Sequence, residues 1–334
     1  MKFITDFLNS GTVKQQNRKK LGALLICITA ALLAVALIVL TVAAIAGAIK
    51  NKGEDEEEET GPKIPSGYVT TTFEEGQSSN GDLLLLDEAH PYVGGAPTVV
   101  LMDTEENRPY VNGDERVYYV ENRTTFSLTE AAMAGFLAMV TDFFEETGDN
   151  NLYVSQAYEA DVASELHKNG CTVTLKYYAD LTADPIPKLP IYDAEAKAPV
   201  ETYQWIYDNA AKYGFVRASN VEGEENIFRY VGAVHAKAMQ DKKLTTVAEY
   251  ITYLQTKHAF PSQLGVTVRG ADGKDVKYGV YYIAPDADQY VPEEGTYDYT
   301  VSGDNMGGYI VTVTKTKASK PSNTTNNNNT ITPA

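Results

Sequence analysis

The longest apolar stretch of the chain covers residues 21–49, none of which is charged. An α-helix crosses the hydrocarbon core of a bilayer with about 20 residues, so residues 21–49 are predicted to form a transmembrane helix. A cleaved signal peptide is the alternative, because Ala46-Gly47-Ala48 has the small residues of a cleavage site. The apolar region of a signal peptide is only about 7–15 residues long, which favours a retained anchor.

Charge is distributed unevenly on the two sides of this run. The net charge is −17, yet residues 1–52 hold seven basic residues against Asp6 alone, which gives +6 there and leaves −23 for the rest. Arg18-Lys19-Lys20 directly precedes the run, and the positive-inside rule then places residues 1–20 in the cytoplasm and the C-terminal part outside the cell. Nucleic acid is not expected as a partner, because it is bound by clustered Lys and Arg.

Two segments without apolar periodicity flank a folded region. Residues 50–81 are acidic and then rich in Gly, Pro, Ser and Thr, and are predicted to form a flexible stalk. Residues 317–334 are predicted to be a disordered Asn/Thr-rich tail. The cysteines are Cys27 and Cys171, which leaves one thiol in the expected extracellular part and excludes a disulfide within it.

Helical periodicity marks three segments between these flanks. In residues 128–146 apolar side chains recur at i, i+3, i+4 and i+7, and Gly148 marks the end of that helix. Residues 201–212 also place apolar side chains on one face. A third helix is predicted to begin at the capping-box pair Thr246 and Glu249.

Short apolar or alternating runs bounded by turn residues predict strands, at 83–86, 98–101, 152–155 and 171–178. Prolines are frequent in residues 179–200, which are predicted to form a loop. Residues 259–316 return to β-like patterns and are predicted to form a small C-terminal β extension of three short strands. Helices and strands that are segregated in this way indicate an α+β fold.

Several local motifs share the order and spacing of one known family. The most specific are Trp205-Ile206-Tyr207-Asp208-Asn209-Ala210 with Tyr213-Gly214-Phe215, followed by Phe228-Arg229-Tyr230-Val231-Gly232. Weaker matches are the leucine run before His90-Pro91 and Ser155-Gln156-Ala157-Tyr158. The chain resembles the zinc D-alanyl-D-alanine carboxypeptidases of the bacterial cell wall, the VanY-like family, over most of residues 82–255. The resemblance implies a carboxypeptidase-like domain over 82–258, with an antiparallel sheet and flanking helices.

The family resemblance also implies a zinc site, with a His and an Asp in the pattern S-x-H-x-x-G-x-A-x-D and a second His in E-P-W-H. A catalytic zinc needs three protein ligands and an open position for water. His167 matches the first ligand, but Thr174 stands at the Asp position and Ile227 at the second His position. Two of the three expected ligands are therefore replaced.

The remaining family positions are only partly kept. Glu224 stands at the position of the general base, and Ser155 and Tyr158 match the substrate-binding motif. The Arg of that motif, which meets the terminal carboxylate of the substrate, is replaced by Glu159. An acidic side chain there repels such a carboxylate.

Two functional hypotheses follow from the resemblance. The first is a membrane-anchored, catalytically impaired relative outside the cell, which needs no cofactor and binds cell-wall peptidoglycan or a surface protein. The alternative is an active zinc D,D- or L,D-carboxypeptidase that trims peptidoglycan stem peptides with a relocated metal site. The three-ligand requirement favours the first hypothesis.

Overall fold

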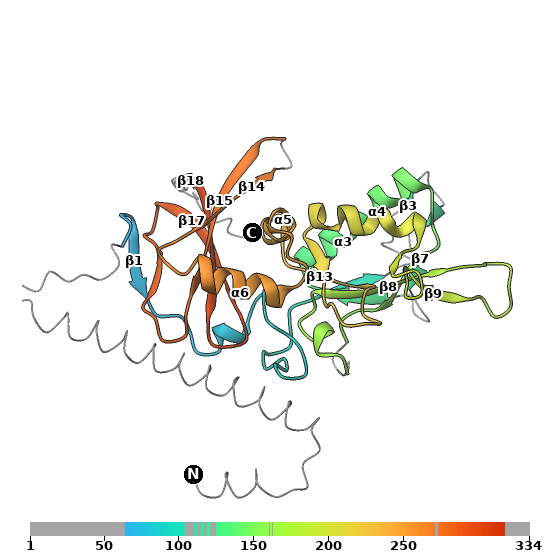
Figure 1. Ribbon diagram of the computed structural model, residues 1–334, viewed down its shortest axis with the longest axis horizontal. Coiled ribbons are helices and arrows are strands. Elements are labelled where there is room, and N and C mark those ends of the chain that lie inside the picture. Colours follow the sequence, from blue (N-terminus) through green and yellow to red (C-terminus); the bar gives the residue numbers. More distant parts are fainter. Residues whose placement is uncertain are drawn as a thin grey trace, which may run out of the picture. The chain divides into compact units, whose positions relative to one another are not determined.

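The computed structural model describes residues 64–317, apart from 104–109, 112–114, 117–118, 121–124, 160, 162 and 271–272 (Figure 1). All described residues belong to one compact unit, which begins at Pro62. The transmembrane helix predicted over 21–49 lies outside the described residues. Within the described part, no helix is long and apolar enough to cross a membrane.

A six-stranded sheet forms the first half of the described fold. Its strand order is β12-β13-β8-β7-β5, with β9 paired to β8, and all pairs are antiparallel except β5 with β7. The sequence correctly predicts β7 and β8. The strands are β5 (Tyr119–Val120), β7 (Leu152–Gln156), β8 (Thr172–Tyr178), β9 (Lys188–Pro190), β12 (Phe215–Arg217) and β13 (Ile227–Tyr230).

Helices cover one face of this sheet. The predicted helix over 128–146 is confirmed as α3 (Glu130–Thr147), which ends at Gly148 with φ 68°, a conformation that glycine adopts without strain. The helix predicted over 201–212 is three consecutive pieces, η3 (Glu201–Tyr203), α4 (Gln204–Asn209) and η4 (Ala210–Tyr213). Their apolar side chains pack with those of β7, β8, β12 and β13 in the first hydrophobic core.

Three short strand pairs complete this half, and they correct part of the sequence prediction. Strand β2 (Val100–Asp103) pairs with β6 (Thr125–Leu128), and β3 (Tyr110–Val111) pairs with β4 (Glu115–Arg116). The loop predicted over 179–200 contains β9 and the hairpin of β10 (Tyr192–Asp193) with β11 (Ala198–Pro199). Pro190 and Pro199 are the last residues of β9 and β11, where a missing N–H does not break a ladder.

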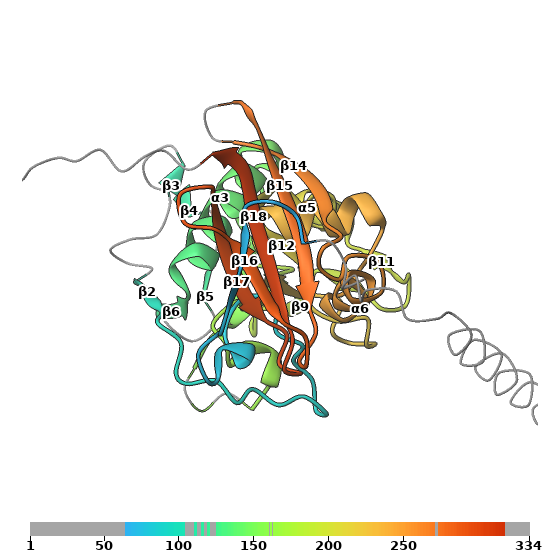
Figure 2. The ribbon, with the colours of Figure 1, turned by 90° about the vertical axis from the view of Figure 1, so that its left-hand side faces the viewer.

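A second sheet, of order β14-β15-β18-β17, forms the C-terminal half (Figure 2). It is larger than the predicted extension of three short strands, because β14 was not expected and β15 and β18 have nine residues each. Helices α5 and α6 pack their buried side chains against this sheet in a second hydrophobic core. The elements are α5 (Ala233–Lys242), α6 (Val247–Lys257), β14 (Leu264–Arg269), β15 (Asp275–Ile283), β17 (Tyr297–Gly303) and β18 (Tyr309–Lys317).

The predicted start of α6 is confirmed in detail. The Thr246 hydroxyl accepts from the backbone N–H of Glu249, and the Glu249 carboxylate accepts from the backbone N–H of Thr246. These two bonds satisfy amides that the first helical turn leaves without partners.

The flexible stalk predicted over 50–81 is wrong for its described part. Residues 64–81 include β1 (Tyr68–Thr71), which pairs with β16 (Gln289–Pro292), and the short helix η1 (Gln77–Ser79). Gly303 lies so close to η1 that an added Cβ atom would stand 2.1 Å from the Ser78 carbonyl oxygen. Contacts distant in sequence therefore order this segment, which composition alone does not reveal.

Residues 82–92, here called the strap, connect η1 with the first half. The sequence predicts a strand over 83–86, but the strap has no strand partner. Its backbone is held instead by the β17–β18 turn, because Leu85 N–H donates to the Asp304 carbonyl at 2.9 Å and Asn305 Nδ2 donates to the Leu85 carbonyl at 3.1 Å. The Asp304 carboxylate accepts from Tyr282 OH and two turn amides, which fixes the turn.

Candidate functional site

The structure brings the three family ligand positions together on one face of the first sheet. His167 ends the short helix η2 (Glu165–His167), which leads into β8. Thr174 on β8 and Ile227 on β13 are direct cross-strand partners. The His167 Nε2 atom lies 3.0 Å from the Thr174 hydroxyl oxygen. The residues that replace the expected ligands therefore stand where a shared metal site requires them.

His167 is fully buried, and both of its ring nitrogens have hydrogen-bond partners. Nδ1 lies 3.1 Å from the Ser164 hydroxyl, and Nε2 is bonded to Thr174. Burial lowers the pKa of His167 to about 4, so the imidazole is neutral near pH 7. With both nitrogens engaged, the ring has the environment of a core histidine.

These side chains do not fit a zinc ion. Ile227 has no lone pair, and the Thr174 hydroxyl is a far weaker donor than the carboxylate expected there. Among the described residues, no three His, Cys, Asp or Glu side chains are grouped so that they could hold a metal. The other described histidines lie elsewhere, because His235 is bonded to Tyr250 of the second core, His90 to Asp87 and His258 to Tyr253.

The strap covers the ligand positions with apolar side chains. Leu84 and Leu86 are buried in a small cluster against which Ile227 and Tyr92 pack. The end of the strap is fixed by the Tyr92 N–H, which donates to Glu165 Oε2 at 2.7 Å. This packing removes His167 from solvent, whereas a catalytic centre must admit substrate.

A buried arginine beneath the strap holds it in place. Arg229 is 1% exposed, and its guanidinium donates to the Leu84 carbonyl at 2.6 Å and to the Asp82 carbonyl at 3.0 Å. Burial raises the pKa of the Asp82 carboxyl and of the Cys171 thiol, whose sulfur lies 3.3 Å from Asp82 Oδ1, and lowers the pKa of Arg229. The sequence analysis does not predict this cluster. The one sequence feature that points to it is the position of Arg229 within the Phe228–Gly232 motif.

Comparison with known proteins agrees with this geometry. No protein-family profile matches the chain. A curated D-alanyl-D-alanine carboxypeptidase of Enterococcus faecium is 25% identical over 257 residues, which cover 72% of this chain and 78% of that protein. The predicted resemblance to the VanY-like family is confirmed. The match covers 72% of the chain, whereas residues 82–255, over which the resemblance was predicted, make up little more than half of the chain.

A solved structure shows the same mixed helix and sheet fold. The vancomycin resistance D,D-dipeptidase VanXYg, in complex with a D-Ala-D-Ala phosphinate analogue, superimposes with a TM-score of 0.51 at 16% sequence identity. The match covers 74% of this chain and 99% of VanXYg. Both the carboxypeptidase-like half and part of the remainder therefore belong to the shared fold.

The other VanY-like positions make backbone or side-chain contacts with the backbone of neighbouring segments. Glu224 precedes β13 in a turn, where its backbone N–H donates to the Val221 carbonyl and its carbonyl accepts from Ile227. Ser155 donates to the backbone carbonyl of Thr174 at 3.2 Å, which ties β7 to β8 at the ligand position. Tyr158 forms an isolated bridge with Ser127, and Glu159 follows it directly.

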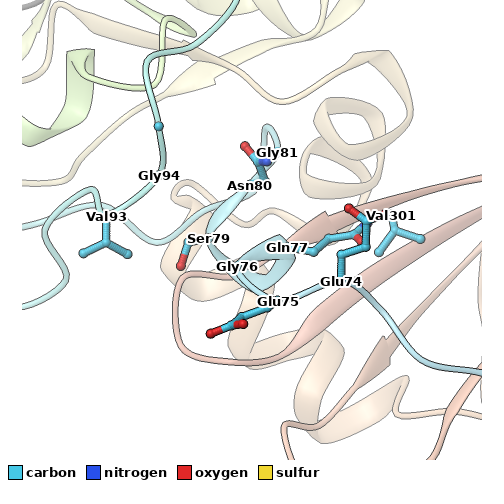
Figure 3. Close-up of a pocket in the computed structure, with 11 residues that line it drawn as sticks. Glu74, Glu75, Gly76, Gln77, Ser79, Asn80, Gly81, Val93, Gly94 and Val301 are labelled. Carbon is cyan, nitrogen blue, oxygen red and sulfur yellow. The ribbon is translucent and has the colours of Figure 1, made fainter.

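A cavity of about 680 Å³ lies away from these positions (Figure 3). It is lined by η1 and its flanking residues, by the segment that follows the strap, and by Val301 of β17. Its carboxylates are Glu74 and Glu75, and Figure 3 shows them projecting from the turn before η1. None of the VanY-like site residues lines it, so the cavity's size does not make it the candidate catalytic centre.

Proposed function

We propose that this chain is a catalytically impaired D-alanyl-D-alanine carboxypeptidase-like protein, anchored in the cell membrane through residues 21–49. Its C-terminal part lies outside the cell and binds a component of the cell wall or another surface protein. It does so without zinc. The homology supports a peptidase-like ancestry, and the anchor and the orientation rest on the apolar run and its flanking charges.

The observation that carries the proposal is the hydrogen bond between His167 and Thr174, with Ile227 beside it. A zinc ion at this point has one good donor instead of three, and that donor is already bonded on both nitrogens. The loss of the carboxylate-binding Arg, replaced by Glu159, acts in the same direction. Ligand and substrate positions have changed together, which is consistent with lost catalysis and a retained fold.

The alternative is an active zinc D,D- or L,D-carboxypeptidase. VanXYg supports it as a structural neighbour that binds a D-Ala-D-Ala analogue. It requires ligands other than Thr174 and Ile227, and the described residues offer no such group. We therefore rank it second.

Zinc content of the purified full-length chain separates the two functions. After dialysis against trace zinc, elemental mass spectrometry is expected to find no stoichiometric zinc, and a D-Ala-D-Ala peptide is expected to stay intact. One tightly held zinc per chain, with peptide hydrolysis that a chelator abolishes, establishes the alternative and contradicts the proposal.

A restored ligand set tests the positions themselves. Thr174→Asp combined with Ile227→His returns both family ligands beside His167, and this double variant is expected to bind one zinc per chain. Thr174→Asn with Ile227→Leu is the matched control, similar in size but without the two donors, and is expected to bind none. A folded double variant that takes up no zinc contradicts the assignment of these residues as ligand positions.

Binding of the wall component is tested with intact peptidoglycan sacculi. The full-length chain in lipid nanodiscs is expected to sediment with the sacculi, and empty nanodiscs are not. A chain that stays in the supernatant at every salt concentration contradicts the wall-binding form of the proposal. A surface protein is then the remaining partner.

A further inference from the structure

A small apolar pocket lies at the edge strand β12 of the first sheet, and none of the ligand positions lines it. In the cross-strand register, Arg217 on β12 stands opposite Phe228, and Phe215 stands opposite Tyr230. Side chains alternate between the two faces of a strand, so these residues face the helices, whereas Ile227 and Arg229 face the strap. Because no VanY-like site residue lines it, the pocket is separate from the VanY-like site.

The walls of this pocket come from both hydrophobic cores. Its volume is about 160 Å³, and its apolar lining includes Tyr207, Phe215, Phe228, Met239 and Leu244. Helix α5 contributes Met239 and packs against η4 and β12. A cavity of about 150 Å³ with apolar walls holds a molecule of the size of benzene.

The half-buried Arg217 places a positive charge at the border of this apolar lining. Its Nε atom is buried and has no hydrogen-bond partner among the described residues, and Nη2 makes only a 3.3 Å contact with the Ser219 carbonyl. Within the described part of the chain, Arg217 forms no ion pair. The nearby Glu225 carboxylate is bonded to the Gly223 amide instead. A buried guanidinium nitrogen without a partner is destabilising unless a ligand or water completes it.

We propose that the Arg217 pocket binds a carboxylate that is attached to one small apolar group. The guanidinium fork matches the two oxygens of a carboxylate, and the aromatic and aliphatic walls accept the apolar body. Two sources share this chemistry, a free organic acid and the apolar C-terminal residue of a peptide. This inference does not depend on the proposed function, because it uses different residues.

Ligand-observed NMR on the full-length chain in lipid nanodiscs tests the pocket. Benzoate is expected to bind saturably, whereas benzamide, which keeps the ring and loses the charge, is expected to bind about tenfold more weakly or worse. Acetate, which keeps the charge and loses the ring, is also expected to bind more weakly. Equal binding of benzoate and benzamide, or no saturable binding of benzoate and of the peptide acid below, overturns the proposal.

Three variants locate the binding. Arg217→Gln removes the charge, and Ala211→Leu fills the pocket from η4 while Arg217 stays intact. Both are expected to weaken benzoate binding about tenfold or more. Arg269→Gln is the control, because Arg269 is an exposed arginine on β14 and its loss changes the net charge equally. Circular dichroism verifies that each variant is folded, and benzoate binding to Arg217→Gln at the unchanged affinity overturns the proposal.

A peptide pair distinguishes the two sources. Ala-Ala-Phe as the free acid is compared with its C-terminal amide, in competition with benzoate. Displacement by the acid alone identifies a peptide C-terminus as the ligand, and absence of displacement with saturable benzoate binding identifies a free acid. Displacement by both peptides to the same extent contradicts the role of the carboxylate.

Discussion

Each half of the described fold buries one histidine, and the two histidines have matching hydrogen bonds. His167, at the family ligand position, bonds to the hydroxyls of Ser164 and Thr174. His235, in the second core, bonds to the hydroxyls of Tyr250 and Thr312, both at 3.0 Å. Burial lowers the pKa of each to about 4. The histidine at the family ligand position therefore has the same kind of surroundings as the core histidine His235.

The surroundings of the two histidines differ. Next to His167, the Thr172 hydroxyl, the Asn169 amide nitrogen and the Arg229 Nε atom are buried without hydrogen-bond partners among the described residues. None of the residues bonded directly to either histidine has such an atom. Near His167 these polar atoms lie on the segments that carry the ligand positions, whereas in the described second half the buried unpartnered atoms are His258 Nδ1 and Asn305 Oδ1, which belong to residues not bonded to His235.

Among these predictions, replacement of Arg229 is expected to cause the largest loss in the free energy of unfolding. Arg229→Met removes both bonds to the strap and leaves the Asp82 carboxyl buried without its cation. Removal of one partner from a buried charged cluster costs about 3–5 kcal/mol. Urea unfolding of wild type and variant measures the loss.

Arg269→Met is the control for Arg229→Met. Arg269 and Asp275 are 71% and 59% exposed, so this change is expected to stay within about 0.5 kcal/mol of wild type. If both variants unfold at the same urea concentration, the strap does not depend on Arg229, and the region around His167 is less enclosed than its contacts indicate.

Acid is expected to destabilise both halves through their histidines. Each imidazole has a pKa of about 4 in the fold and about 6.5 in the unfolded chain, so between these values the unfolded state binds more protons. Stability therefore falls as pH is lowered from about 6.5 to 4, by up to about 3 kcal/mol for each histidine. Unfolding free energies at pH 7 and pH 4.5 measure the loss.

Single substitutions show which histidine causes the loss of stability in acid. His167→Gln and His235→Gln are each expected to reduce the difference in stability between pH 7 and pH 4.5, and by similar amounts. A His167→Gln variant with the wild-type pH dependence means that His167 takes up protons in the folded state. The ligand position would then be open to water, which breaks the parallel with His235.

Several helices and strands of this fold can be predicted from the sequence because they depend on short-range patterns. Helix α3 follows from its apolar period, α6 from its capping box, and β8 from alternation. The strap does not follow from them, because Leu83 is buried in the second core while Leu84 and Leu86 are buried with Leu166. A run of four leucines has the same pattern whether it joins a sheet or bridges two cores.

The site residues that lie within sequence motifs can be predicted, and the contacts between distant segments cannot. Register from the Phe228–Gly232 motif places Ile227 at a ligand position, and the structure pairs it with Thr174. The role of Arg229 does not follow from the sequence, since its bond to the Leu84 carbonyl spans 145 positions of the chain. No periodicity links residues at that separation.

Loss of the hydroxyl partner is expected to affect both histidines equally. Thr174→Val and Thr312→Val keep the shape of the side chain and leave Nε2 of His167 or His235 buried without a partner. A buried polar atom that loses its partner costs about 1–3 kcal/mol. Urea unfolding at pH 7 is expected to give similar losses for the two variants. An unchanged stability for Thr174→Val alone means that water replaces the hydroxyl, so that the ligand position is hydrated and the second core is not.

The smallest expected effect has the opposite sign. The Thr172 hydroxyl is buried on β8 without a hydrogen-bond partner among the described residues, and Thr172 lies opposite Arg229 on β13. Thr172→Val removes a hydroxyl that is desolvated on folding and forms no compensating hydrogen bond with a described residue. The free energy of unfolding is therefore expected to stay unchanged or to rise by up to about 1 kcal/mol. Thr267→Val, at an exposed position of β14, is the control for the change in strand propensity.

A loss of more than about 1 kcal/mol in Thr172→Val relative to this control means that a buried water joins Thr172 to Arg229 Nε. The unpartnered groups beside His167 would then be satisfied, and the two buried histidines would lie in equally complete surroundings.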